Sequence, residues 1–483
     1  MNLAELLQPW VSTSIPVCEI VGLHNDSRQI KAGYLFFAYP GVLADGRLFI
    51  QQAIAAGAAA IIYDANALPA SWVLPTTIPC LPVAELASKL AAIASHFYNN
   101  PARSLNVIGV TGTSGKTTIA YQLAQAYDLL GEEAAYIGTL GQGRVQALQA
   151  LANTTPDGLC LQQLFHDYKQ AGLQRVCMEV SSHALSQKRA ENIEFVQAIY
   201  TNLSHDHLDY HLTMSAYAAA KAQLFAIPTL KSAIVNHDDE YAPQMVAHLP
   251  AGCEKLTYGI REGSDVCAIQ WQSTMAGSEF EVSSPWGKQQ VRINILGAFN
   301  VYNSLAIFTS LLANGFEARE VVPVMAKLQA APGRMEVVVQ EPCVIVDFAH
   351  TPDALENVLS TLLRLKRARL IVVFGCGGDR DKAKRPVMGH IAGKYADVVV
   401  VTSDNPRTEN PAQIIADIAT GLPVNTQALT IVNREQAIAK ALSLADKHDI
   451  VLIAGKGHES YQEIGRNRFD FSDQDVVRRL VRG

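Results

Sequence analysis

Short apolar runs and longer amphipathic stretches alternate along most of this 483-residue chain. The apolar runs are rich in Val and Ile, which is typical of strands that are buried on both faces. In the first hundred residues they predict strands at 34–38 and 59–63, with a helix at 49–56 between them. Further along, they predict two groups of strands, at 106–110, 176–180, 198–201 and 233–235 and at 344–348, 370–374, 398–402 and 450–453.

This alternation predicts an α/β fold with parallel sheets that are covered by helices on both faces. Two clusters of helix- and strand-breaking residues, Asn99-Asn100-Pro101 and Ala331-Pro332-Gly333-Arg334, separate periodic segments. They predict three domains with the bounds 1–100, 101–330 and 331–483, the first a small α/β domain. Parallel sheets bind ligands beyond the carboxyl ends of their strands, so we expect a site in the loops that follow the strands.

Composition and charge narrow the functional class. Only 17% of the residues are charged and 49% are hydrophobic, which excludes a disordered chain. The net charge of −6 and the lack of any Lys/Arg block argue against a nucleic-acid binder or a membrane-surface binder, so we expect neither partner. Eight scattered cysteines, no basic n-region and no apolar stretch long enough to cross a bilayer predict a cytoplasmic protein with free thiols.

The strongest motif runs from Gly109 to Thr118, G-V-T-G-T-S-G-K-T-T, between a predicted strand and a predicted helix. Glycines let successive N–H groups turn toward a phosphate, the lysine adds a positive charge, and the first threonine after it can reach Mg²⁺. Val110 stands where the longer phosphate-loop pattern has Gly, so the match is to the form G-x-x-G-K-T. The candidate ATP-binding residues of this loop are Gly112, Thr113, Ser114, Gly115, Lys116, Thr117 and Thr118.

Polar residues also follow the next two strands. Glu179 stands at the end of the strand at 176–180, and the segment after 198–201 carries five ionisable side chains, His205, Asp206, His207, Asp209 and His211. Such a cluster is costly to bury, so it predicts a metal or phosphate site. Zinc stays open on composition, but beside a phosphate loop we favour Mg²⁺. Lys221, within an Ala-rich helix, reads from composition alone as a solvated lysine.

The last third of the chain has polar loops after each of its strands. They cover 347–353, 375–381, 404–407 and 455–459, and two of them place Arg beside acidic residues. Loops of this kind at one sheet edge suit a ligand that is itself zwitterionic.

Taken in order, these motifs resemble the Mur ligase family, ATP-dependent amide ligases of peptidoglycan precursor synthesis. The resemblance implies a central phosphate-loop ATPase domain with a parallel sheet, a Rossmann-like C-terminal domain that binds the incoming amino acid, and an N-terminal domain that binds the uridine nucleotide. It implies the substrates UDP-N-acetylmuramoyl-L-alanyl-D-glutamate, ATP and meso-diaminopimelate, and we expect a monomer. The residues implied for the UDP-substrate are Ser27, Asn153, Thr154, Thr155, Ser181, Gln187 and Arg189.

The family resemblance also changes the interpretation of Lys221. In Mur ligases the lysine at this place is carbamylated, and it holds a second Mg²⁺ together with Glu179 and His207. The resemblance therefore implies Lys116, Glu179, His207 and Lys221 as catalytic residues, and Thr117, Glu179, His207 and carbamylated Lys221 as metal ligands. It adds Asn303, Arg334, Asp347 and His350 to the ATP site.

The segment Asp404-Asn405-Pro406-Arg407 bears on the amino acid that is added. Family members that use diaminopimelate carry D-N-P-R here, and those that use lysine usually differ at the Arg. A guanidinium can bind the distal carboxylate of diaminopimelate, which lysine lacks. The residues implied for diaminopimelate are Arg380, Asp404, Asn405, Arg407, Gly455 and Glu459.

The expected reaction forms an acyl phosphate on the D-glutamate γ-carboxylate, which the amine of diaminopimelate then attacks. A lysine-adding or folylpolyglutamate-type ligase would keep the ATP site and change the third-domain loops. A phosphate-loop kinase or a non-hydrolysing nucleotide-binding module would need no amine-dependent step. The residues alone leave these alternatives open.

Overall fold

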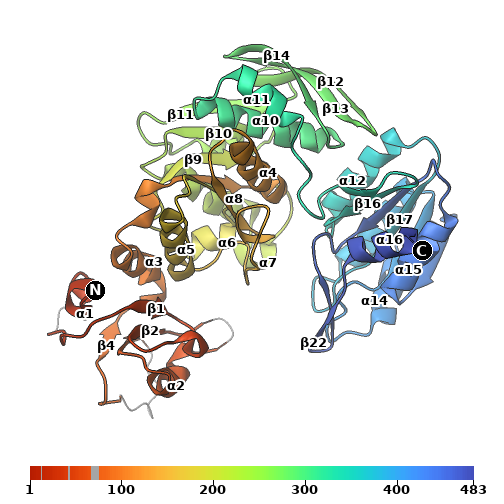
Figure 1. The fold of residues 1–483 in the computed structure, drawn as a ribbon. Coiled ribbons are helices and arrows are strands. Elements are labelled where there is room, and N and C mark those ends of the chain that lie inside the picture. Colours follow the sequence, from red (N-terminus) through yellow and green to blue (C-terminus); the bar gives the residue numbers. More distant parts are fainter. Residues whose placement is uncertain (12–13, 42–43, 67–74, 483) are drawn as a thin grey trace.

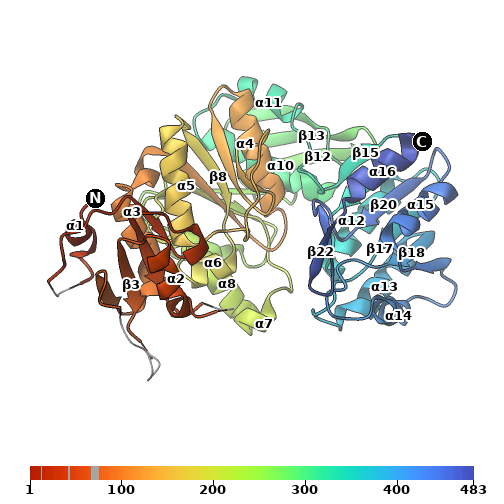
Figure 2. The same cartoon turned by 60° about the horizontal axis from the view of Figure 1, so that its bottom comes forward.

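The computed structural model describes residues 1–11, 14–41, 44–66 and 75–482. Three α/β bodies follow one another in chain order, with the N-terminal part at one end of the molecule and the C-terminal part at the other (Figures 1 and 2). Each has its own sheet, which confirms the predicted fold class. The predicted borders after residues 100 and 330 fall between helices and strands of neighbouring sheets.

The N-terminal sheet has the order β1-β2-β3-β4, and all its neighbouring strands are parallel. The predicted strands at 34–38 and 59–63 are β2 and β3, whereas the predicted helix at 49–56 begins as a 3-10 turn at Gly46–Phe49. Leu90 and Ile93 pack against the strands and close the core. The elements are β1 (Gly22–His24), β2 (Tyr34–Ala38), β3 (Ala60–Asp64), β4 (Cys80–Val83), α1 (Leu3–Leu7), α2 (Ile50–Ala55) and α3 (Leu86–Phe97).

The central sheet has the order β14-β13-β12-β11-β10-β9-β5-β8-β6-β7. The middle strands are parallel, as the apolar runs predict. The strands are β5 (Asn106–Thr111), β6 (Ala134–Gly138), β7 (Gly141–Gly143), β8 (Arg175–Glu179), β9 (Phe195–Tyr200), β10 (Ser232–Asn236), β11 (Glu254–Gly259), β12 (Val266–Thr274), β13 (Gly277–Ser284) and β14 (Gly287–Ile293).

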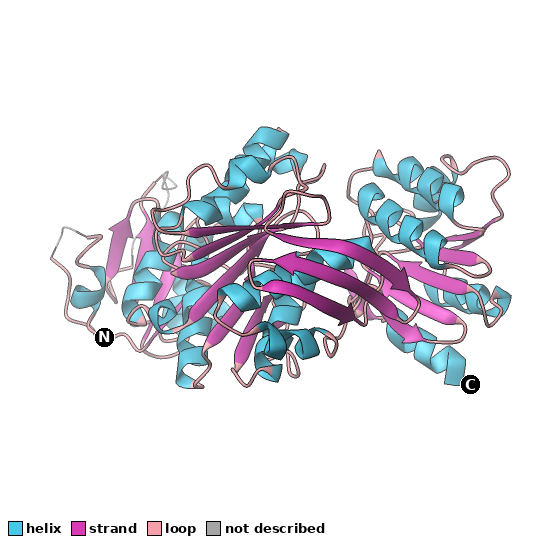
Figure 3. Ribbon diagram, turned by 90° about the horizontal axis from the view of Figure 1, so that it is seen from above, coloured by secondary structure: helices cyan, strands magenta, loops and turns pink. Residues whose placement is uncertain are grey.

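The antiparallel ribbon β12-β13-β14 is absent from the strands expected from the sequence. Its strands are half exposed, so polar residues interrupt the apolar run that marks a buried strand. Seen from above, this ribbon extends from the central sheet toward the C-terminal part (Figure 3).

Helices cover both faces of the central sheet and create two cores. On one face, Leu123 and Phe308 of α4 and α10 pack against the strands. On the other, Phe165 and Tyr217 of α5 and α8 do so. Because both faces are buried, a ligand can reach only the strand ends. The helices are α4 (Lys116–Leu129), α5 (Gly158–Gln170), α6 (Ser182–Ser186), α7 (Leu208–His211), α8 (Met214–Ala222), α9 (Ala242–Met245), α10 (Ala298–Ala313) and α11 (Ala318–Met325).

The C-terminal sheet has the order β15-β16-β20-β17-β18-β19 and is parallel except at β15. It contains the four predicted strands and is followed by the hairpin β21-β22, which the sequence pattern does not predict. The strands are β15 (Glu336–Val339), β16 (Cys343–Asp347), β17 (Leu370–Phe374), β18 (Val398–Thr402), β19 (Ala428–Ile431), β20 (Ile450–Ala454), β21 (Tyr461–Ile464) and β22 (Asn467–Asp470). The helices are α12 (Pro352–Leu365), α13 (Lys384–Tyr395), α14 (Pro411–Ala419), α15 (Arg434–Leu444) and α16 (Asp473–Arg482).

Two sequence-based expectations about the whole chain can be compared with the fold. All eight cysteines are free thiols. In the part of the chain that the structure describes, no helix combines the length and the apolar character needed to cross a bilayer.

A buried ion pair joins α15 to α16. Both Arg434 and Asp473 have fully buried side chains, and the guanidinium Nε lies 2.8 Å from the carboxylate. Arg434 also donates to the carbonyl oxygens of Ser403 and Ala454, beside two of the polar loops. Since the charge of Asp473 favours the guanidinium in this dry site, it opposes the effect of burial and the pKa of Arg434 stays above its usual value.

We expect Asp473→Ala to lower the free energy of unfolding by about 3–5 kcal/mol, because it leaves an uncompensated buried guanidinium. Differential scanning calorimetry measures the effect. Glu435→Ala is the control: it breaks an exposed pair with Arg479 and should cost less than about 1 kcal/mol. Equal losses in the two variants would contradict this account, and Arg434→Met combined with Asp473→Leu should recover much of the stability.

Candidate functional site

The phosphate loop connects β5 to α4 at the carboxyl edge of the central sheet, as predicted. Gly112 has φ 148°, and a Cβ there would lie 1.8 Å from Thr201 Oγ1. Gly115 has φ 89°, and a Cβ there would lie 2.7 Å from Asn303 Oδ1. Only glycine fits both positions without strain, so the tight loop that a phosphate site needs depends on these two glycines.

The two residues that follow β9, Thr201 and Asn202, form hydrogen bonds with this loop. The backbone N–H of Ser114 donates to Asn202 Oδ1 at 3.0 Å, and Thr201 Oγ1 donates to the Ser114 carbonyl at 2.6 Å. Lys116 Nζ donates to the carbonyl oxygens of Gly112 and Thr113, both at 2.9 Å. Desolvation lowers the pKa of Lys116, and the charge of Arg334 acts in the same direction. The loop thus holds its lysine in place.

Glu179 is buried at the end of β8 and joins several groups of the site. Thr117 Oγ1 donates to its carboxylate at 2.9 Å, as do Tyr136 OH at 2.5 Å and the Thr139 N–H at 2.8 Å. Tyr136 and Thr139 do not appear among the residues expected from the sequence. They follow from the position of β6 beside β8, which only the strand order reveals.

Lys221 is buried, with 1% of its surface exposed, so the interpretation as a solvated lysine was wrong. Its Nζ donates to the Gly112 carbonyl at 2.8 Å and lies 4.5 Å from the centre of the Tyr217 ring. Burial holds the pKa of Lys221 well below its usual value, and the nearby charge of Lys116 lowers it further. Burial at this position therefore favours the neutral amine over the ammonium form.

The histidine-rich segment after β9 is spread over the surface and the interior. His205 and Asp209 are exposed, whereas His211 is buried and lies 2.9 Å from Ser182 Oγ. His207 has its ring 4.9 Å from that of His183, and desolvation lowers its pKa, with Lys116 and Lys221 contributing. Within the described residues, no three His, Cys, Asp or Glu side chains form a ready metal-binding group.

The side chains predicted to bind the metal differ in the ligand atoms that they offer. Thr117 and Glu179 supply hydroxyl and carboxylate oxygens, which are hard ligands suited to Mg²⁺, and they already touch each other. Lys221 Nζ donates to the Gly112 carbonyl of the phosphate loop, and the His207 ring lies 6.0 Å from that of Tyr217, whose hydroxyl is 3.2 Å from Thr113 Oγ1. The residues therefore fit Mg²⁺ beside a phosphate, and they offer no preassembled zinc site.

The residues predicted for the UDP-substrate gather at the other side of Glu179. Thr155 Oγ1 donates to the Glu179 carbonyl, and the Ser181 N–H donates to Thr155 Oγ1. Arg189 donates to the Thr155 carbonyl at 3.1 Å and to Gln187 Oε1 at 2.5 Å. Arg189 is thus held at the loop that contains Thr155, and this loop is hydrogen-bonded to the backbone of Glu179.

The other members of this predicted group lie farther out. Thr154 Oγ1 is 3.1 Å from Thr139 Oγ1, and Asn153 is exposed. Ser27 belongs to the N-terminal part, where it donates to Gln52 Oε1. A hydrogen bond from Asn25 to Asp157 joins that part to the segment that follows Thr155. Asn25, two residues before Ser27, thus contacts the segment that follows Thr155, whereas Ser27 bonds within the N-terminal part.

The residues predicted to add to the ATP site divide into two groups. Arg334 reaches the phosphate loop: it donates to Thr117 Oγ1 at 3.2 Å and lies over the Phe348 ring at 4.4 Å. Asn303 lies beside Gly115. Asp347, by contrast, is buried and accepts from the N–H groups of Met335 and Ala349.

Asp347 and His350 both contact the backbone of the segments that flank β15 and β16. Burial raises the pKa of Asp347, and its two backbone donors favour the charged form. His350 is exposed, with Nδ1 2.8 Å from the Phe348 carbonyl. Lys384 Nζ donates to the backbone carbonyl of His350 at 2.8 Å. In this structure Asp347 thus holds the backbone that carries Arg334.

The residues predicted for the amino acid line loops of the C-terminal sheet. Asn405 is buried and donates to Glu459 Oε2 at 2.8 Å, while the fully buried Lys456 donates to both residues. Asp404 Oδ2 lies 2.6 Å from where a Cβ of Gly455 would stand. The structure thus brings Asn405 and Glu459 together at the ammonium group of Lys456, and Asp404 beside Gly455.

The two arginines of this group differ in their surroundings. Arg407 Nε lies 3.0 Å from Glu463 Oε2, and its Nη1 donates to the Gly378 carbonyl. Arg380 is exposed and donates to the carbonyl of Asp379. Arg407 is therefore held in one orientation, whereas Arg380 is not.

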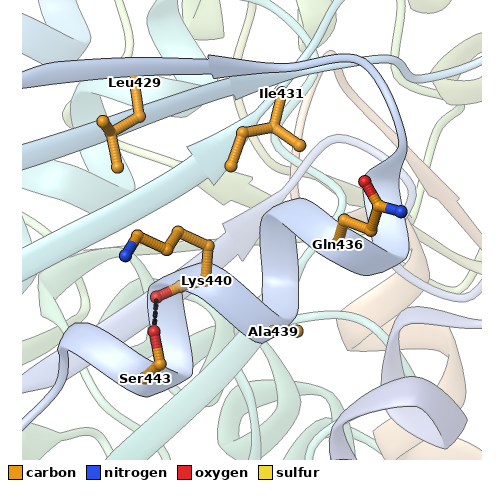
Figure 4. A pocket seen from close by; sticks show the side chains of 6 residues that line it. All are labelled: Leu429, Ile431, Gln436, Ala439, Lys440 and Ser443. Atoms are coloured by element: carbon orange, nitrogen blue, oxygen red, sulfur yellow. Dashed lines mark hydrogen bonds between the residues drawn. The ribbon is translucent and has the colours of Figure 1, made fainter.

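A surface hollow between β19 and α15 contains none of the predicted residues (Figure 4). Its side chains are apolar or solvated, and it offers no carboxylate or phosphate-binding loop. They are Leu429, Ile431, Gln436, Ala439, Lys440 and Ser443. The chemistry lies at the strand ends instead.

Three family models match successive parts of the chain: the Mur ligase family catalytic domain at 19–98, the Mur ligase middle domain at 110–311, and the Mur ligase glutamate ligase domain at 333–457. The chain is 45% identical, over 94% of its length and 92% of the relative's, to the UDP-N-acetylmuramoyl-L-alanyl-D-glutamate--2,6-diaminopimelate ligase of Chromobacterium violaceum. A solved structure of a ligase of the same name is 37% identical, with TM-score 0.71 and coverage of 100% and 99%. The MurF ligase of Thermotoga maritima in complex with ADP shares the fold, with TM-score 0.65 at 20% identity and coverage of 90% and 94%.

Leu212 ends the short helix α7 in a strained turn next to the site. Its φ is 65° and its ψ −38°, and the Thr213 N–H donates to the His211 carbonyl at 2.8 Å, which forms a γ-turn. The side chain is 79% exposed, so little packing compensates the strain. Leu212→Gly should raise the free energy of unfolding by about 1 kcal/mol, since glycine tolerates this conformation. Thermal denaturation checks it, and Leu212→Ala, which keeps a Cβ, should show no such gain.

Proposed function

Because this chain belongs to the Mur ligase family, we propose that its site joins meso-2,6-diaminopimelate to UDP-N-acetylmuramoyl-L-alanyl-D-glutamate in an ATP-dependent, ADP-forming reaction. The chain is thus a ligase of peptidoglycan precursor synthesis. The observation that carries the assignment of the site is the meeting of the phosphate loop, Glu179 and the buried Lys221 at one sheet edge.

The reaction must bring two anions together, the γ-phosphate of ATP and the γ-carboxylate of D-glutamate. Transfer of the phosphoryl group gives an acyl phosphate and ADP, and attack by the amine forms the amide and releases phosphate. Lys116 and the N–H groups of the phosphate loop lower the repulsion between these anions by electrostatics and positioning, without a protein nucleophile. Arg334 is placed to add a second positive charge at Thr117.

We propose that Thr117, Glu179, His207 and carbamylated Lys221 hold Mg²⁺, two ions in all. When bound, Mg²⁺ supplies positive charge that compensates the phosphate oxygens. Lys221 suits carbamylation, because only a neutral amine adds to CO₂ and burial lowers the pKa of this lysine. The addition releases a proton and leaves an anion in place of an ammonium group that Lys116 would otherwise repel.

We propose a division of labour among domains with the bounds 1–100, 101–330 and 331–483. The first binds the uridine nucleotide with Ser27, and the loop around Thr155 and Arg189 receives the sugar-peptide end. The central domain binds ATP, and the third domain binds diaminopimelate. Because the amino-acid residues and the phosphate loop lie on different sheets, the third domain must close on the central one before the amine attacks.

The choice of diaminopimelate over lysine rests on Arg407. Its guanidinium is ordered by Glu463 and Gly378, and a carboxylate at the far end of the amino acid would bind it through charge-assisted hydrogen bonds. Lysine has no such carboxylate and would leave the arginine unpaired. We further propose that the protein acts as a monomer in the cytoplasm, where its eight thiols stay reduced.

The reaction can be tested by measuring ADP release with purified protein. We expect release to require both the UDP-dipeptide and diaminopimelate, and the product to gain one amide bond by mass spectrometry. A panel containing lysine and glutamate in place of diaminopimelate separates this ligase from lysine-adding and folylpolyglutamate-type relatives. Equal ADP release without any amine, and no amide product, would leave only a phosphate-loop kinase or ATPase.

Lys221→Ala should lose at least about 100-fold in kcat, because the site loses the anion that completes its metal ligands. Bicarbonate or a short carboxylate added to the assay should restore part of the rate, since it can occupy the space that the side chain leaves. Lys188→Ala is the control, because Lys188 is exposed and pairs with Glu191. Full activity of Lys221→Ala with an unchanged melting temperature would remove the carbamate from the mechanism.

A further inference from the structure

The hairpin β21-β22 has no part in the proposed reaction, yet it is bound to the loop that selects the amino acid. In the turned view the hairpin lies on the side of the C-terminal part that faces the central part (Figure 2). The Arg407 N–H donates to the Glu463 carbonyl at 3.0 Å, and the Gly465 N–H donates to the Arg407 carbonyl at 2.7 Å. The hairpin therefore adds backbone pairing to a loop whose Arg407 has φ 49°.

Two further hydrogen bonds connect β21 with the same loop. The Glu463 N–H donates to Asn405 Oδ1 at 2.9 Å, and Gln462 Nε2 donates to the Asp404 carbonyl at 2.6 Å. Asp404, Asn405 and Arg407, the three residues of this loop that we propose bind the amino acid, thus each have a hydrogen-bond partner on β21. The hairpin therefore holds both the backbone of Arg407 and the side-chain amide of Asn405.

The side chain of Glu463 acts on the guanidinium itself. Its Oε2 lies 3.0 Å from Arg407 Nε, and the Gly378 carbonyl accepts from Nη1 at 2.9 Å. Both side chains are largely buried, with 24% of Arg407 and 21% of Glu463 exposed, so water screens the pair only in part. Glu463 thus pairs with the Nε side of the guanidinium and Gly378 with one N–H of Nη1, which leaves Nη2 and the second N–H of Nη1 to face a carboxylate.

Glu463 and the two arginines that it contacts carry a net positive charge that one ligand carboxylate would compensate. Glu463 Oε1 lies 2.9 Å from Arg468 Nη2, and the Arg468 guanidinium lies over the Tyr461 ring at 4.4 Å. Two arginines and one glutamate sum to one positive charge. A ligand carboxylate on Arg407 would complete the balance. Diaminopimelate and lysine both carry an ammonium group at this end, but lysine brings no carboxylate and would leave the positive charge uncompensated.

We propose that Glu463 is a positioning residue that orients Arg407 for the distal carboxylate of the incoming amino acid, and so sets the preference for diaminopimelate over lysine. This inference rests on the proposed function. Glu463 itself touches neither substrate nor ATP; it acts through the guanidinium.

The test compares Glu463→Ala and Glu463→Gln with the wild-type protein in steady-state assays. Glu463→Ala should raise the KM for diaminopimelate about tenfold, leave kcat and the KM values for ATP and the UDP-dipeptide within about twofold, and lower the diaminopimelate-to-lysine ratio of kcat/KM about tenfold. Glu463→Gln keeps the shape of the side chain but removes the charge that pairs with Arg407, so it should lose about as much as Glu463→Ala. Glu435→Ala, whose exposed carboxylate pairs with Arg479, is the matched control and should equal the wild type.

An unchanged KM for diaminopimelate in Glu463→Ala would overturn the inference, as would a parallel rise of all three KM values with a lowered melting temperature. The proposed function fails by a different result, namely a wild-type protein that makes no amide from diaminopimelate. In that case calorimetric titration with diaminopimelate and lysine still decides the inference, because it requires the wild type to bind diaminopimelate more tightly than Glu463→Ala does.

Discussion

Two lysine ammonium groups share the carbonyl oxygen of Gly112, Lys116 at 2.9 Å and Lys221 at 2.8 Å, and the rest of the site depends on this arrangement. Two cations so close together, one of them fully buried, repel each other unless anions enter or one amine becomes neutral. Both remedies suit a phosphate site: bound phosphates supply anions, and a neutral Lys221 can become a carbamate. The neighbouring carboxylate of Glu179 is held by Tyr136 and Thr139, so it stays in place beside the loop.

The same logic explains how an acidic chain binds anionic nucleotides. A net charge of −6 provides no general attraction for ATP or a uridine diphosphate. We propose that the attraction is local, from phosphate-loop N–H groups and from three cations, Lys116, Arg189 and Arg334. Each of these cations is held by hydrogen bonds to carbonyl or hydroxyl oxygens in the protein. Cations fixed in this way lose little freedom when a ligand binds, which favours positioning over bulk charge.

In the third domain, by contrast, the charges are paired before any ligand arrives. Arg434 is neutralised by Asp473, Lys456 by Glu459, and Arg407 in part by Glu463. A neutral, zwitterionic amino acid needs such a site, because an excess of either charge would attract one of its ends and repel the other. In the proposed reaction the central site would take anions and the third-domain site a zwitterion, so the acyl phosphate and the amino acid would be separated by charge as well as by sheet.

Local patterns determined much of this protein. Buried parallel strands appear as apolar runs, and the phosphate loop is recognisable because its glycines, Lys116 and Thr117 are neighbours in sequence. The half-exposed strands β12-β14 and the hairpin β21-β22 lack such runs, and from composition Lys221 reads as solvated. Only the tertiary structure buries Lys221 against Gly112, places Tyr136 beside Glu179 and sets Glu463 on Arg407. These contacts join residues from 43 to 109 positions apart, and their energies depend on burial and strand order, which no local pattern records.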